Sequence, residues 1–198
     1  MPDFASRDPN SPSFWNERFE SGFTPWDRGG VPSALRDFVA RQQGPLRTLI
    51  PGCGCAYELA FLSEAGWDAT AIDFSPAAVA AARVAVGEWG DRVIEADFFQ
   101  WEAAQPLELI YERAFLCALP RVMWPQVAAR WARLLPPGAR LAGFFFFDDA
   151  AKGPPFGISA QALDTLMDAS FVCVEDAPVA DSIAVFNGKE RWKVWQRV

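Results

Sequence analysis

The chain has 198 residues, enough for one domain with a sizeable core and too few for two domains of ordinary size. Apolar residues make up 51% of it and charged residues 22%, a balance typical of a globular protein and not of a disordered one. The net charge of −7 argues against a nucleic-acid partner, and the absence of histidine excludes histidine-based catalytic triads and most zinc sites.

The first residues and the cysteines bear on the compartment. Residues 1–10 lack the apolar run of a signal peptide, and no apolar stretch approaches the length that crosses a membrane. Two of the four cysteines flank a single glycine and the other two lie in apolar runs, which differs from the pattern of a disulfide scaffold. We expect a cytoplasmic monomer with reduced cysteines, no bound metal, and no membrane or nucleic-acid partner.

The N-terminal segment predicts two helices joined by a loop. Ser13 is the candidate N-cap of a helix over residues 14–20, whose aromatic side chains share one face. Ser33 is the candidate N-cap of a second helix over residues 34–43, which Gly44 ends. The intervening segment SGFTPWDRGGVP is rich in glycine and proline and predicts a loop.

Short apolar strands then alternate with helices. The expected strands cover residues 47–50, 68–73, 92–96, part of 107–119, and 140–147, and the expected helices cover residues 57–65, 76–86, 125–135 and 159–168. Ser75 and Pro76 have the residue types of an N-cap and a first helical position. This rhythm predicts an α/β fold with a mostly parallel sheet and helices on both of its faces.

The C-terminal end departs from this rhythm. Residues 170–176 and 190–198 are two segments with strand composition, and Asn187 and Gly188 between them are turn residues. They predict an antiparallel hairpin at the edge of the sheet.

A glycine-rich turn follows the first predicted strand, and an acid ends the second. Gly52 and Gly54 precede a helix, where free backbone amides favour a polar or anionic ligand and glycine permits its close approach. Asp73 lies 19 residues after Gly54, where an acid accepts hydrogen bonds from both hydroxyls of a ribose. Together these features predict a nucleotide-type ligand.

The residues after the third strand indicate which ligand. Asp97 is followed by Phe98 and Phe99, an acid and aromatic rings that suit an adenine amine and the face of its ring. The third glycine of a dinucleotide fingerprint is missing. The pattern therefore favours S-adenosylmethionine (SAM) over a nicotinamide dinucleotide, the alternative being that both phenylalanines are core residues.

At these motifs the sequence resembles the thiopurine S-methyltransferase superfamily, which also contains plant and bacterial halide/thiol methyltransferases. The similarity extends from about Trp15 to Val198. The motifs that carry it are WxxxF from Trp15, TPWDxG from Thr24, PGCG from Pro51, DxSP from Asp73, DFF from Asp97 and YERAFLCALP from Tyr111.

The resemblance implies a fold and an activity. The fold is the Rossmann-like, seven-stranded fold of SAM-dependent methyltransferases, with a mostly parallel sheet, a C-terminal antiparallel hairpin and an N-terminal helical cap. One methyltransferase domain would span residues 1–198, with the cap over the cofactor in residues 1–44 and the core in residues 45–198. The activity is methyl transfer from SAM, leaving S-adenosylhomocysteine, to a small soft nucleophile such as a thiol, thiopurine, sulfide or halide.

The resemblance also implies site residues, position by position. Those similar to the family's cofactor contacts are Trp15, Phe19, Trp26, Gly52, Gly54, Asp73, Asp97, Phe98 and Arg113. Trp26 and Arg113 would also face the methyl acceptor. No catalytic residue is identified, because a soft nucleophile needs little proton transfer.

Structural alternatives exist for several of these residues. Trp15 and Phe19 have the i, i+4 spacing of a helix face, which core packing would also explain. Arg113 lies in an apolar strand and needs an anionic partner there. That partner is the SAM carboxylate, an acidic acceptor, Asp97 or Glu112.

The motifs are divided between the two branches of the superfamily. CGCAYE and Arg113 resemble the thiopurine branch, whereas TPWD and FLCALP resemble the halide/thiol branch. Cys53 and Cys55 are interpreted as small residues beside a cofactor and not as metal ligands. Two alternatives to the soft-nucleophile activity stay open: O- or N-methylation of a small metabolite, with Tyr111 or Glu112 as the base, and SAM binding without turnover.

Overall fold

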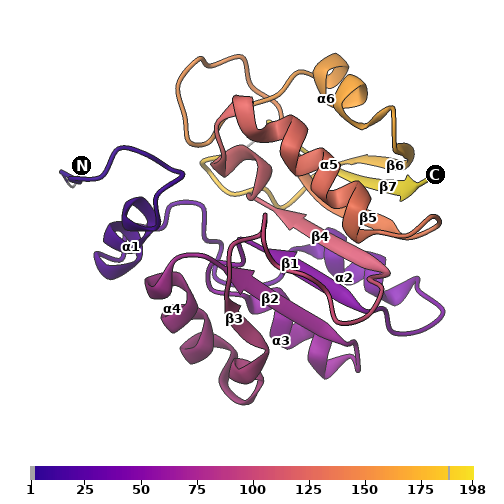
Figure 1. Cartoon of the computed structure of the whole chain (residues 1–198), viewed down its shortest axis with the longest axis horizontal. Coiled ribbons are helices and arrows are strands. Elements are labelled where there is room, and N and C mark those ends of the chain that lie inside the picture. The colour runs from indigo at the N-terminus through magenta and orange to yellow at the C-terminus, as the bar shows by residue number, and fades with distance from the viewer. Residues whose placement is uncertain (1–2, 187) are drawn as a thin grey trace.

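The computed structural model describes residues 3–186 and 188–198, and its centre is a single seven-stranded sheet with the strand order β3-β2-β1-β4-β5-β7-β6 (Figure 1). The strands are β1 (Thr48–Pro51), β2 (Ala69–Asp73), β3 (Val93–Glu95), β4 (Leu109–Arg113), β5 (Arg140–Phe146), β6 (Phe171–Pro178) and β7 (Glu190–Arg197). The α-helices are α1 (Pro12–Glu20), α2 (Ser33–Ala40), α3 (Tyr57–Glu64), α4 (Pro76–Val86), α5 (Trp124–Leu134) and α6 (Ala160–Met167). Short 3₁₀ helices cover Gly87–Arg92, Leu116–Ala118 and Arg121–Met123.

The first five strands pair in parallel, as the sequence predicts. Strand β7 pairs antiparallel with β6, as expected, and also with β5, which the sequence did not predict. The β6–β7 pair is the hairpin expected at the edge of the sheet. The turn expected between these two strands includes residue 187, which lies outside the described residues.

Helices cover both faces of the sheet, and strand β5 shows how the sequence produces this. Leu141 and Phe145 point to one face, where they pack with residues of α5 and α6. Ala142 and Phe144 point to the other face and pack with residues of α2, α3 and α4. A strand buried on both faces reads as a nearly continuous apolar run, which explains the sequence LAGFFFF.

The order of the strands determines where a ligand can bind. Strand β1 pairs with both β2 and β4. Strands β2 and β3 follow on one side of β1 and strands β4 and β5 on the other, so the strand order switches between β1 and β4. In open α/β sheets, ligands bind at such a switch point, beyond the carboxyl ends of the strands.

Two predicted helix starts are wrong. Helix α1 begins at Pro12, after Ser11, so that Ser13 lies inside the helix. Helix α2 begins at Ser33 itself, after Pro32, and it ends at Ala40, well before Gly44. In α1, Pro12 occupies the first helical position, which suits the fixed φ of proline, and this preference outweighs the capping preference of Ser13. In α2, Pro32 is itself the N-cap residue, with an extended backbone (φ −64°, ψ 150°), so Ser33 enters the first turn. By contrast, Ser75 caps α4 as predicted, and its Oγ accepts a hydrogen bond from the amide of Ala78 (3.1 Å).

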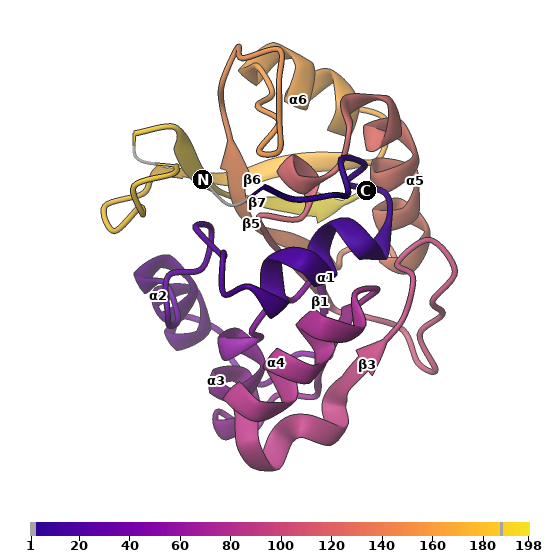
Figure 2. The same cartoon turned by 90° about the vertical axis from the view of Figure 1, so that its left-hand side faces the viewer.

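The two N-terminal helices have different environments. Helix α2 buries Leu35 and Phe38 in the core, where Phe38 packs against Trp192 of β7. Helix α1 lies beside α4, across the carboxyl ends of the first strands (Figure 2). Within the described part of the chain, no helix has the length and hydrophobicity needed to cross a membrane.

The contact between β4 and β5 predicts a stability defect. Gly143 is opposite Glu112, and a methyl group at Gly143 would overlap the carbonyl oxygen of Glu112. We expect Gly143→Ala to lower the free energy of unfolding by about 1–3 kcal/mol, because a buried backbone cannot move aside easily. Gly44→Ala is the matched control, because its added methyl group meets nothing within 4 Å. Equal urea midpoints for the two variants would contradict this packing.

Candidate active site

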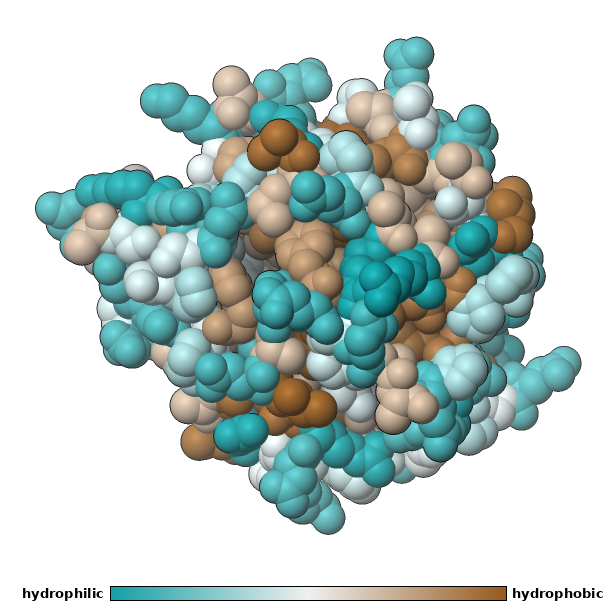
Figure 3. Space-filling model, viewed as in Figure 1, coloured by the Kyte–Doolittle hydropathy of each residue, from teal (hydrophilic) through white to brown (hydrophobic). Residues whose placement is uncertain are grey.

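A cavity of about 670 Å³ lies at the carboxyl ends of β1, β2, β3 and β4, beneath α1 and the loop that follows it. This volume is typical of a small-molecule site. All the site residues predicted from the sequence line it, namely Trp15, Phe19, Trp26, Gly52, Gly54, Asp73, Asp97, Phe98 and Arg113. In Figure 3, apolar residues surround a recess beside the N-terminal segment.

The turn between β1 and α3 forms the floor of the cavity. Gly52, Gly54 and Ala56 all have positive φ values, of 57°, 53° and 54°. A Cβ on Gly52 would lie 2.5 Å from the ring of Phe115, so glycine is required there by packing within the chain. Ala56 adopts the left-handed conformation that glycine reaches more easily.

Asp73 is buried at the end of β2 and joins two elements of the site. Its Oδ2 accepts from the amide of Gly54 (3.2 Å) and its Oδ1 accepts from the amide of Ser75 (3.0 Å). A carboxylate has about four lone-pair sites, so two remain for hydroxyl groups of a ligand. Burial raises the pKa of Asp73 to about 6, and the carboxylate is therefore largely ionised at neutral pH.

Asn16 fastens α1 to the same turn. Its Oδ1 accepts hydrogen bonds from the hydroxyl of Ser75 (2.7 Å) and from the amide of Ala77 (3.3 Å). The helix that carries Trp15 and Phe19 is thereby fixed to the residue that holds Asp73. Sequence reasoning missed Asn16, because a polar residue on a short helix carries no signal of its long-range partner.

Three aromatic side chains roof the cavity. The ring of Trp26 packs edge-on against Trp15 (5.4 Å between centroids) and Phe19 (6.0 Å), and all three are half-buried. The residue of α1 that is fully buried is instead Phe14. The core-packing alternative for Trp15 and Phe19 is therefore the weaker one, because their rings border a cavity.

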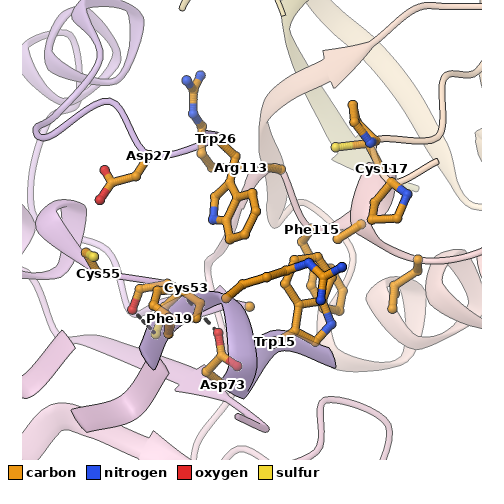
Figure 4. A pocket seen from close by; sticks show the side chains of 18 of the residues that line it. Trp15, Phe19, Trp26, Asp27, Cys53, Cys55, Asp73, Arg113, Phe115 and Cys117 are labelled. Carbon is orange, nitrogen blue, oxygen red and sulfur yellow. Dashed lines mark hydrogen bonds between the residues drawn. The ribbon is translucent and has the colours of Figure 1, made fainter. Parts of the chain in front are cut away.

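Figure 4 shows how the roof lies over the site. Trp26 stands in its middle, with Asp27 and Cys55 on one side and Phe115 and Cys117 on the other. Asp27 Oδ1 accepts from the amide of Gly29 (2.8 Å), and its Oδ2 accepts from the Tyr57 hydroxyl (3.4 Å).

The cavity ends beyond β3 at Asp97 and Phe98. Asp97 accepts one hydrogen bond at each oxygen, from the amide of Phe99 (2.9 Å) and from the side chain of Gln100 (3.0 Å). Phe98 is buried and packs against Phe115 (4.9 Å between centroids). Phe98 thus has both predicted environments, since it belongs to the core and also borders the cavity.

The partner of Arg113 differs from the acids considered from the sequence. Its Nη1 pairs with Glu190 of β7 (3.3 Å), and its guanidinium lies over the ring of Phe144 (4.3 Å). Glu112 turns the other way and accepts from the amides of Phe115 and Leu116. Glu190 was missed because only the insertion of β7 beside β5 brings it near β4. The buried Nη2 of Arg113 has no partner among the described residues, so Arg113 retains a donor for an anionic group of a ligand.

Three thiols border the cavity, and all of them are protonated at neutral pH. Burial, with the hydrogen bond to Asp27 as the next cause, raises the pKa of Cys55 to about 11. Burial and nearby carboxylates raise the pKa values of Cys53 and Cys117 well above the ordinary thiol value. Among the described residues, no group of three or more cysteines and acids could hold a metal ion.

Comparison with known proteins identifies the family. The thiopurine S-methyltransferase family model matches residues 10–198. The chain belongs to the thiopurine S-methyltransferase family. It is therefore a methyltransferase that uses SAM, and the resemblance inferred from its motifs is confirmed.

Curated relatives come from both branches of the superfamily. The chain is 27% identical to a probable thiol methyltransferase 2 of Arabidopsis thaliana, over 95% of this chain and 86% of the relative. It is 28% identical to thiocyanate methyltransferase 1 of Brassica oleracea, over 93% and 84%. It is 26% identical to a thiopurine S-methyltransferase of Shewanella piezotolerans, over 81% and 83%.

Solved structures confirm the fold. A 1,6-didemethyltoxoflavin-N1-methyltransferase of Burkholderia thailandensis, solved with S-adenosylhomocysteine, has a TM-score of 0.73 at 18% identity, covering 100% of this chain and 93% of that one. The magnesium protoporphyrin IX methyltransferase of Synechocystis, solved with SAM, has a TM-score of 0.71 at 17% identity, over 98% and 99%.

The donors and acceptors of the cavity fit SAM. Asp73 and Asp97 have acceptor capacity for a nucleoside, and Arg113 has a free buried donor for a carboxylate. Aromatic rings, among them those of Trp15, Phe19 and Trp26, border part of the remaining volume.

The protonated thiols predict resistance to self-methylation. A thiol with a pKa of about 11 is a thiolate in only roughly one molecule in several thousand at pH 7.5, and the thiolate is the nucleophile. We expect the mass of the protein to stay unchanged after prolonged incubation with SAM alone at pH 7.5. A methyl group found on the peptide that contains Cys55 would contradict this protonation state.

Proposed function

We propose that this enzyme transfers the methyl group of SAM to a small soft nucleophile, namely a thiol, thiopurine, sulfide or halide. The observation that carries the proposal is the state of the acids in the cavity. The carboxylates that border it are Asp27, Glu58, Asp73 and Asp97, and each already accepts a hydrogen bond from the chain. The sequence has no histidine, and Asp73 and Asp97 are the proposed partners of the cofactor's nucleoside. The acids that remain for a general base are Asp27 and Glu58, and each is already paired with a tyrosine hydroxyl (3.4 and 3.3 Å).

The acceptor must therefore arrive ionised or nearly so. Thiols have ordinary pKa values near ~8.5, aromatic thiols ionise more readily, and halides carry no proton. The printed names of the curated relatives, which are thiol, thiocyanate and thiopurine methyltransferases, support the same class of acceptor.

Each group of the site has a part in this proposal. Bound SAM supplies a methyl group that its sulfonium already activates. Asp73 would hold the ribose hydroxyls, and Asp97 with Phe98 would hold the adenine. Gly52 and Gly54 would let the backbone approach the cofactor closely.

The remaining predicted residues orient the reactants and exclude water. Trp15, Phe19 and Trp26 would close over the cofactor, and Trp26 would also face the acceptor. Arg113 would bind the carboxylate of the cofactor or an anionic acceptor through its free Nη2. Orientation in a dry cavity accelerates a displacement that needs no proton transfer.

Oxygen or nitrogen methylation is the second candidate, and its expected bases are badly placed. Tyr111 is fully buried and its hydroxyl donates to Glu58 (3.3 Å). Glu112 Oε1 is bound to two backbone amides beneath the turn after β4. Neither residue borders the cavity, and burial raises the pKa of Tyr57, which does border it, to about 12.

We also propose that the enzyme acts as a monomer in the cytoplasm. Its four free cysteines support a reducing compartment.

A matched set of acceptors tests the proposal. Thiophenol, phenol and aniline share one ring and differ in the nucleophilic atom. We expect S-adenosylhomocysteine release with thiophenol to exceed release with phenol or aniline by roughly a hundredfold or more. Thiophenol ionises readily, phenol needs a base that the site does not supply, and the neutral nitrogen of aniline is a weaker nucleophile towards the sulfonium methyl group than a thiolate. Iodide, hydrosulfide and a thiopurine then rank the soft acceptors. Faster release with phenol or aniline than with thiophenol would contradict the proposal.

A further inference from the structure

Glu190 is a buried carboxylate that lies next to Arg113 and outside the cavity. It is the first residue of β7 and is only 8% exposed. Its Oε1 accepts from Nη1 of Arg113 (3.3 Å), and its Oε2 accepts from the hydroxyl of Ser182. Arg113 borders the cavity, whereas Glu190 does not. An effect of Glu190 on a bound ligand must therefore pass through Arg113.

The ion pair of Arg113 and Glu190 crosses strand β5. Arg113 ends β4 and is opposite Phe144 of β5, and Glu190 is opposite Phe146 of the same strand. Phe144 and Phe146 are two residues apart, so their side chains point to one face of the sheet. The guanidinium of Arg113 lies over the ring of Phe144 (4.3 Å). The ring thus supports one face of the guanidinium while Glu190 holds one of its nitrogens.

The segment that carries Ser182 is itself fixed in place. Asp181 Oδ2 accepts from Nη1 of Arg28 (3.0 Å) and from the amide of Ser33 (2.9 Å), which ties the connection between β6 and β7 to the N-terminal loop and α2. Ser182 therefore donates to Glu190 from a defined position. With both oxygens bound, the carboxylate of Glu190 has one orientation.

This arrangement determines where the free nitrogen of Arg113 points. A guanidinium is planar, so contacts at one nitrogen and one face fix the direction of the others. Nη1 is bound to Glu190, whereas Nη2 is buried and has no partner among the described residues. A buried ion pair often stabilises a fold no more than apolar residues of the same volume would. The consequence of this pair is therefore the orientation of Nη2.

We propose that Glu190, held by Ser182, is the positioning residue that directs Nη2 of Arg113 to an anionic group of a bound ligand. The inference rests on the proposed function and adds the residue on which the anion contact depends. The anionic group is the carboxylate of the cofactor or an anionic acceptor. Glu190 acts through its hydrogen-bond geometry, because its negative charge alone would repel an anion.

Two conservative variants separate geometry from charge. Glu190→Gln removes the charge and keeps the length of the side chain, so its amide oxygen still accepts from Arg113 and its amide nitrogen donates to Ser182. Glu190→Asp keeps the charge and is one methylene shorter, which withdraws the carboxylate from Arg113. Positioning by geometry predicts a defect in Glu190→Asp and near wild-type behaviour in Glu190→Gln.

Two measurements distinguish the sources of the anion. Calorimetry compares S-adenosylhomocysteine with its decarboxylated analogue, and the ratio of their dissociation constants reports the contact with the carboxylate. The KM for iodide reports the contact with an anionic acceptor. We expect Glu190→Asp to lower the preference for S-adenosylhomocysteine, or to raise the KM for iodide, roughly tenfold. Glu190→Gln should stay within about threefold of the wild type. A loosened site would instead weaken both nucleosides equally.

Three further variants complete the design. Glu190→Asp added to Arg113→Met should change neither readout further, because Glu190 acts through Arg113. Lys189→Met is the matched control, since Lys189 precedes Glu190, pairs with Asp148 and does not border the cavity. Ser182→Ala releases one oxygen of Glu190 and should shift the same readout about threefold. It keeps the test decisive where Glu190→Asp fails to fold.

The outcomes separate this inference from the proposed function. Unchanged readouts in Glu190→Asp and Ser182→Ala, equal weakening of both nucleosides, or a defect as large in Glu190→Gln as in Glu190→Asp would overturn the inference. An equal effect of Glu190→Asp with and without Arg113 would overturn it as well. If the wild-type enzyme methylates neither iodide nor any thiol, the proposed function fails. The ratio of the two dissociation constants alone then decides about Glu190.

Discussion

One buried carboxylate organises the site. Asp73, at the carboxyl end of β2, accepts from the amides of Gly54 and Ser75 and so fixes the glycine turn relative to the start of α4. Ser75 in turn donates to Asn16, which fastens α1 and its aromatic residues over the cavity. One chain of hydrogen bonds therefore connects the floor of the cavity, the buried Asp73 and the aromatic roof. It lies where the strand order reverses.

The same burial that organises the site costs stability. Burial raises the pKa values of Asp73 to about 6 and of Glu112 to about 7, both above their ordinary values. The folded state therefore holds protons that the unfolded state has released, and the contribution of these groups to the free energy of unfolding falls as the pH rises through about 4 to 7. A methyltransferase whose substrate needs no general base can use its carboxylates as hydrogen-bond acceptors for the cofactor. Carboxylates that the backbone already holds by hydrogen bonds are well suited to this role.

Local patterns in the sequence were sufficient to predict much of the fold and many of the residues that line the cavity. The alternation of strands and helices, the cap at Ser75 and the residues at the strand ends all depend on neighbours in sequence. The helix starts at Pro12 and Ser33 were missed because two local preferences compete there. Glu190 beside Arg113 depends on β7 lying next to β5, a long-range pairing that no local pattern reveals. The anchoring contacts of Asn16 are long-range for the same reason.

The dissociation constant of SAM as a function of pH tests most directly whether Asp73 is the central group. If the ionised carboxylate of Asp73 accepts from the ligand, protonation near pH 6 weakens binding, and affinity falls by roughly tenfold between pH 7.5 and pH 5. Asp73→Asn should bind SAM more weakly at pH 7.5 and lose this part of the pH dependence. Equal affinities of the wild-type enzyme at the two pH values, or a variant that binds as tightly as the wild type, would contradict the account.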